Sequence, residues 1–185
     1  MSFIKTTDYL DEITLEGLIK LVDSDLSIID KAESKAIELV RASIGQRYDL
    51  SKAFPIINDF KNGVNYNEGQ YVFFEYEQKK FDFFKCTGNT LQSPTQAPDK
   101  WVNEDPRNPL LVEWTAQIAL YKIYKRAAPN NVPEIRKEDF KYATKKLLEV
   151  QKGEFALSLE KVSEENEVNT SLPFIDSKDE QQFYW

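Results

Sequence analysis

The side chains that could carry out chemistry in this sequence are few in kind. The chain has 31 Asp and Glu residues and one cysteine, Cys86, but no histidine. The lack of histidine excludes Ser-His-Asp and Cys-His catalysis and histidine-ligated zinc, and a single cysteine excludes a thiolate metal cluster. Two carboxylates could still serve as acid and base on a glycoside, but no spacing singles out such a pair. We therefore expect no catalytic residue, no metal site and no cofactor.

Other functional classes are excluded by what the sequence lacks. Its six glycines are scattered and form neither GxxxxGK[ST] nor GxGxxG, the motifs that cradle phosphates. No apolar run reaches the roughly eighteen residues of a membrane span, and the first residues lack the apolar stretch of a signal peptide. A lone cysteine fits a reducing compartment. These features predict a soluble protein that is made in a cytoplasm and is not an enzyme.

Aromatic side chains form a second group with binding potential. They gather in residues 70–77 and 81–86, two runs whose composition is typical of β-strands and whose short connection predicts a β-hairpin. The proline-rich stretch that follows predicts a loop, in which Trp101 folds back over the hairpin. Tyr71, Phe73 and Trp101 are the candidate contact residues of this insertion.

Residues 160–185 carry most of the negative charge. Seven acids and two lysines fall there, so this segment accounts for −5 of the net charge of −7. It has no helical pattern, so on its own it should be extended or disordered. Its apolar clusters are what such a segment needs to dock on another chain, although packing back onto its own domain is an alternative. The clusters are Leu172, Pro173, Phe174 and Ile175, and Phe183, Tyr184 and Trp185.

Four helices are expected to position these segments, because apolar residues recur at three- and four-residue steps. Asn108 and Pro109 form a helix start, and Gly153 is a natural C-terminal cap. The short link at 130–132 makes the last two helices an antiparallel hairpin. The expected helices are residues 14–22, 26–47, 108–129 and 133–153.

From these elements we predict a mainly α fold. It is a four-helix bundle with a small antiparallel β insertion and an extended C-terminal tail. The expected units are residues 1–60 with the first two helices, 61–107 with the β-hairpin, 108–159 with the last two helices, and 160–185 as the tail.

Three segments of the helical frame carry a resemblance to known proteins. They are Ala36–Val40 with Ile44–Leu50; Asn108–Leu111 with Ala116, Ile118–Ala119 and Tyr121–Arg126; and Tyr142–Ala143 with Leu147–Gly153. In their order and spacing they resemble the phage head-tail adaptor and head-completion families, including the Mu-like family of small four-helix connector proteins. The likeness covers about residues 10–55 and 105–160.

This resemblance implies a structural virion protein located at the head-tail interface and assembled in the host cytoplasm. Members form homo-oligomeric rings, commonly twelve-fold, that act as adaptors. The partners it implies are the portal protein, neighbouring copies in the ring, and a downstream tail or stopper ring protein. No membrane contact is expected, and no DNA contact beyond the lining of the channel, because an acidic chain repels phosphates.

The insertion carries a second resemblance. The order Tyr66, Gly69, Val72, Phe74, then Phe84–Cys86, Pro98, Trp101 and Val102 is similar to small carbohydrate-binding modules of the chitin-binding kind. That resemblance implies exposed aromatics that stack on sugars, and hence an alternative function as a carbohydrate- or host-surface-binding module. The same aromatics could instead form the core of the insertion. A third possibility is an acidic regulatory or decoy protein.

Overall fold

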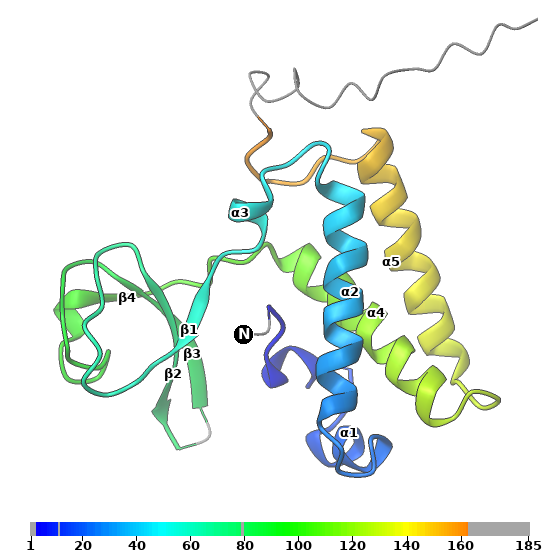
Figure 1. The fold of residues 1–185 in the computed structure, drawn as a ribbon, viewed down its shortest axis with the longest axis horizontal. Helices are drawn as coiled ribbons and strands as arrows, with labels where there is room; N and C mark the ends of the chain where they lie inside the picture. Colours follow the sequence, from blue (N-terminus) through cyan, green and yellow to red (C-terminus); the bar gives the residue numbers. More distant parts are fainter. Residues whose placement is uncertain (1–2, 11, 79, 163–185) are drawn as a thin grey trace, which may run out of the picture.

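The computed structural model describes residues 3–10, 12–78 and 80–162 (Figure 1). In this part of the chain, the long α-helices pack into one body, and the sheet, with η2 beside β4, projects from its side. The helices are η1 (Thr6–Tyr9), α1 (Leu15–Leu21), α2 (Ser27–Ile44), α3 (Leu50–Ala53), η2 (Pro98–Lys100), α4 (Pro109–Ala127) and α5 (Glu134–Lys152). The strands are β1 (Ile57–Asp59), β2 (Tyr71–Glu77), β3 (Lys80–Cys86) and β4 (Trp101–Asn103).

The fold class predicted from the sequence is wrong. Of the residues described, 47% are helical and 15% lie in strands or bridges, and five α-helices accompany a four-stranded mixed sheet. The chain is therefore an α/β mixture and not a mainly α four-helix bundle with a hairpin insertion. The prediction failed at short elements: β1 and β4 have three residues each and α3 has four. Such lengths are too short for a hydrophobic period to show.

The sheet has the strand order β1-β2-β3-β4. Strand β1 runs parallel to β2, and the other neighbours are antiparallel. Because side chains alternate between the two faces of a strand, Val72, Cys86 and Trp101 share one face and form a small core with Tyr66. The sheet thus has a core separate from that of the helices.

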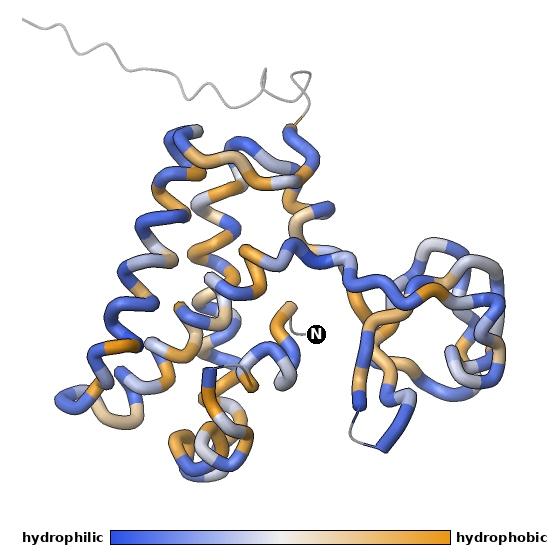
Figure 2. The backbone as a smooth tube through the Cα atoms, turned by 180° about the vertical axis from the view of Figure 1, so that it is seen from behind, coloured by the Kyte–Doolittle hydropathy of each residue, from blue (hydrophilic) through white to orange (hydrophobic). Residues whose placement is uncertain are grey.

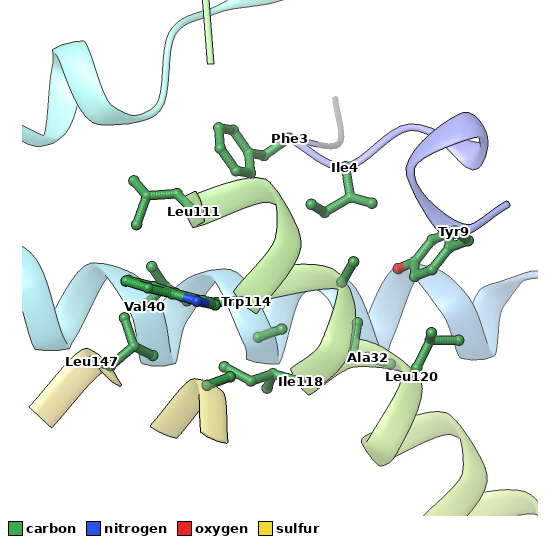
Figure 3. Packing of buried hydrophobic residues seen from close by; sticks show 14 of the residues in the cluster. Phe3, Ile4, Tyr9, Ala32, Val40, Leu111, Trp114, Ile118, Leu120 and Leu147 are labelled. Carbon is green, nitrogen blue, oxygen red and sulfur yellow. The ribbon is translucent and has the colours of Figure 1, made fainter. Parts of the chain in front are cut away.

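Helix α4 is the centre of the helical body and packs against both α2 and α5. The Asn108 side chain accepts hydrogen bonds from the backbone N–H groups of Leu110 and Leu111, which confirms the expected helix start. Trp114 is 1% exposed at the middle of the core (Figure 3). Apolar residues follow the inner sides of these helices (Figure 2). Among the described residues, no helix is long and apolar enough to cross a membrane.

After α5 the chain returns across the body. Gly153 has the positive φ of +81° expected of a C-cap. The backbone N–H of Asp49 donates to the Glu160 carbonyl at 3.0 Å, and the N–H of Val162 donates to the Arg47 carbonyl at 3.1 Å. The first residues of the expected tail, 160–162, are therefore bonded to the body.

Candidate partner-binding surfaces

Arg107 joins the sheet to the helical body. It lies between β4 and α4, and its side chain is 2% exposed. Its guanidinium donates to the Phe3 carbonyl at 2.9 Å and pairs with Asp8 at 2.6 Å and with Asp105 at 2.8 Å. The same group lies 4.1 Å from the centre of the Phe83 ring in β3. One side chain thus connects the N-terminal segment, the linker and the sheet.

Lys5 makes a second connection between the N-terminal segment and the sheet. Its Nζ lies 2.9 Å from an Asp59 carboxylate oxygen in β1 and 4.8 Å from the centre of the Phe73 ring in β2. Its side chain is largely buried. Together, Lys5 and Arg107 hold the sheet at a fixed place beside the helices, so that the two parts can present one rigid surface.

The groups around Arg107 stabilise the positive charge of its guanidinium. Burial alone would lower the pKa of this guanidinium, but the carboxylates of Asp105 and Asp8 outweigh burial and raise it. A buried charge that is fully paired and hydrogen-bonded is tolerated, whereas an unpaired one is costly. Arg107 therefore has a structural role, which is to connect the sheet to the N-terminal segment. The sequence prediction missed it, and the only signal was an arginine close to an acid and to the α4 cap.

An acidic hollow of about 470 Å³ lies next to this junction. Its lining residues are Asp8, Glu12, Asp105, Arg107, Pro109, Val112, Glu113 and Ala116. Glu12 also pairs with Arg136 of α5. No group of acids, cysteines or histidines in the described part of the chain is arranged to hold a metal ion. The acids of the hollow are used mainly in ion pairs that fasten the N-terminal segment.

The three aromatic residues predicted as the contact surface of the insertion do not share one face. Trp101 is 5% exposed, and its indole N–H donates to the Gln92 carbonyl at 3.1 Å. Phe73 lies on the opposite face, where it stacks on Phe81 with ring centres 5.3 Å apart. The Tyr71 hydroxyl donates to a Glu104 carboxylate at 2.9 Å. The structure thus brings Tyr71 and Phe73 to one face and places Trp101 in the core of the other.

Large apolar side chains are exposed around α1. They are Leu10 (50% exposed), Leu15 (47%), Ile19 (37%) and Leu26 (58%), which we name the α1 patch. Leu15 and Ile19 are one turn apart and therefore share a face of α1, while Leu18 and Val22 point into the core. Clusters of this kind mark interaction sites more often than single exposed residues do. The sequence prediction assigned this helix no role in binding.

The seven apolar residues of the predicted docking tail, Leu172–Ile175 and Phe183–Trp185, lie outside the described residues. What the structure does place is the point from which this segment starts. That point is Val162, whose backbone N–H donates to the carbonyl of Arg47 in the turn after α2.

Comparison with known proteins indicates a phage protein. Residues 105–172 match the family model described as Bacteriophage Mu, Gp36. The match covers α4, α5 and the segment after them, and leaves the sheet and the first two helices outside. No curated protein and no solved structure matches the chain. The match confirms the phage part of the expectation from sequence.

Proposed function

We propose that this chain is a structural virion protein, a ring-forming head-tail adaptor that binds the portal and joins it to the tail. The observation that carries the proposal is the phage family match over α4 and α5. These two helices, with α2, build the main core of the molecule. The similarity to a phage family therefore lies in the body of the protein.

The α1 patch supplies a contact surface for neighbouring copies in such a ring. Burying apolar surface yields about 25 cal/mol per Å², and a contact repeated around a closed ring gains avidity, so each one can be small. Helix α1, which carries the exposed Leu15 and Ile19, lies at the end of the body opposite the point where the described chain ends (Figure 1). One end would then serve lateral contacts and the other end docking.

The sheet fits this role as a rigid projection. Because Arg107 and Lys5 fasten it to the body, it can extend the footprint of each subunit on a partner ring. The carbohydrate-binding alternative stays a prediction from sequence. The burial of Trp101 removes one of its three contact residues from solvent.

The experiment that tests the ring contact changes the α1 patch. The double variant Leu15→Glu/Ile19→Glu places charges on the patch and should abolish incorporation into particles while the isolated protein stays folded by circular dichroism. The matched control is Ile56→Glu/Val64→Glu, which changes two exposed apolar residues before and after β1, outside the α1 patch. Normal incorporation of the α1 variant would contradict the proposed contact.

A further inference from the structure

The outer face of α5 carries a line of basic residues. Lys141, Lys145, Leu148 and Lys152 follow one another at steps of four, three and four residues, so they lie in a row along the helix. All four are exposed, and Leu148 is 48% exposed. The opposite face, with Ala143, Leu147 and Val150, is buried in the body. We name this row the α5 stripe.

The lysines of the α5 stripe have no acidic partner within 4.0 Å in the described part of the chain, whereas their neighbours on α5 do. Lys137 pairs with Glu134 at 2.8 Å, and Lys146 pairs with Glu149 at 2.7 Å. Across residues 122–152 there are nine lysines and arginines against four acids, in a chain of net charge −7. The stripe is thus a positively charged surface on an acidic protein, and an acidic partner would neutralise it.

The start of the tail lies next to this stripe. Val162 is bonded to the Arg47 carbonyl, and the Arg47 guanidinium lies against Gly153, where an added Cβ would meet it at 2.7 Å. Gly153 directly follows Lys152, the last residue of the stripe. Figure 1 shows the end of the described chain at the same end of the molecule as the C-terminus of α5.

Residues 163–185 have the complementary charge and sufficient reach. They hold six acids and one lysine, a net charge of −5. Ten residues from Val162 to Leu172 can span up to about 33 Å, while the eleven steps from Lys141 to Lys152 cover about 17 Å of helix. Leu148 and the half-exposed Tyr142 offer apolar surface for the cluster Leu172–Ile175.

We propose that residues 163–185 bind the α5 stripe of their own chain in the free subunit. Binding within the chain is favoured because a short tether holds the segment near its site at an effective concentration in the millimolar range. The acids neutralise the three lysines, and the apolar cluster covers Leu148. A partner that takes up the tail must first displace it, so the contact delays docking until that partner is present. This inference concerns the free subunit and does not depend on ring formation.

A nitroxide spin label on the full chain tests the contact. Ser171→Cys provides the attachment site beside the apolar cluster, since the native Cys86 is fully buried and will not react. The label should broaden the NMR signals of backbone amides along residues 141–152 at low salt. At about 1 M salt the screening length falls to about 3 Å, and the broadening should be lost.

Charge-reversal variants show whether the broadening depends on the lysines of the α5 stripe or on the net charge of the protein. Lys141→Glu/Lys145→Glu/Lys152→Glu should abolish the broadening, while Lys31→Glu/Lys35→Glu/Lys61→Glu, which changes three exposed lysines elsewhere, should leave it intact. All six positions are exposed, so both variants should keep wild-type amide spectra away from the changed sites. Undisturbed α5 signals in the labelled wild type, or broadening that survives the stripe variant, would overturn the proposal.

Two other occupants of the stripe are distinguished in the same samples. Mixing isotope-labelled chain without the nitroxide and unlabelled chain with it reports on contacts between copies. Equal broadening in that mixture would assign the stripe to a neighbouring copy and overturn binding within the chain. A fluorescent DNA duplex that binds through the same three lysines, with no tail contact in the spin-label experiment, would assign the stripe to nucleic acid and overturn the proposal as well.

Discussion

The guanidinium carbon of Arg107 lies 4.1 Å from the centre of the Phe83 ring. This contact joins the linker before α4 to the middle of the sheet. The same guanidinium also forms ion pairs with Asp8 and Asp105. The buried cation therefore interacts with an aromatic ring and two carboxylates. The position of the sheet on the body depends on this residue.

Replacing Arg107 with alanine should lower the free energy of unfolding by about 3–5 kcal/mol, because it leaves the largely buried Asp8 carboxylate without its charged partner. Arg107→Lys should recover only part of the loss, since the single ammonium nitrogen of a lysine cannot pair with both carboxylate oxygens of Asp8 and of Asp105 as the guanidinium does. Urea unfolding measures both. The control is Lys80→Ala, which removes an exposed pair with Glu77 and should change little. Equal effects of the two alanine variants would contradict the fastening role.

Tyr9 should make the protein sensitive to alkali. Its hydroxyl donates to Glu33 at 3.0 Å in a buried place, and burial first, then the Glu33 charge, raises the pKa of Tyr9 above its usual range. Below about pH 10 the phenol is neutral in both states and its contribution to stability is intact. Above about pH 10 the unfolded chain ionises and the folded one does not, so stability falls by about 1.4 kcal/mol per pH unit.

The measurement is urea unfolding from about pH 9 to about pH 11. Tyr9→Phe should flatten the fall over this range, whereas Tyr76→Phe, at a half-exposed position in β2, should not. A Tyr9→Phe protein that loses stability as steeply as the wild type would show that another group causes the alkaline unfolding.

Trp114→Ala should cost about 3–5 kcal/mol, because the side chain, in the first half of α4, is 1% exposed within the core. Trp114→Phe should cost less, since the indole N–H has no hydrogen-bond partner to lose. Leu91→Ala, at a position 58% exposed, serves as the control and should stay within about 0.5 kcal/mol. Thermal unfolding measures all three. A melting temperature of the alanine variant close to wild type would contradict the packing described.

Truncation tests where the tail begins. A chain ending at Val162 should stay folded, lose only the small stabilisation that the contact of residues 163–185 with the α5 stripe gives, and fail to enter particles. A chain ending at Leu159 should in addition be less stable, because it loses the hydrogen bonds of Glu160 and Val162 to residues 47–49, each worth about 1 kcal/mol. Unfolding curves and particle composition measure the two effects. Normal particles from the chain ending at Val162 would contradict the docking role of the tail.

How much the sequence predicted depended on the length of each element. Helices α2, α4 and α5 have 18 or 19 residues, long enough for a clear period, and Asn108 and Gly153 marked their ends. Strand β1 escaped prediction because three residues show no alternation, and its pairing with β2 is fixed by contacts distant in sequence. The role of Arg107 also depends on distant partners, Phe3 and Asp8, that no local pattern reveals.

The mass of the purified protein, measured alone and after mixing with the portal protein, tests the central claim most directly. The adaptor account predicts a small species alone and a ring of many copies bound to the portal in the mixture. It also predicts that the ring is lost with Leu15→Glu/Ile19→Glu and that binding to the portal is lost with the chain ending at Val162. A mixture in which the two proteins remain separate at micromolar concentrations would contradict the account.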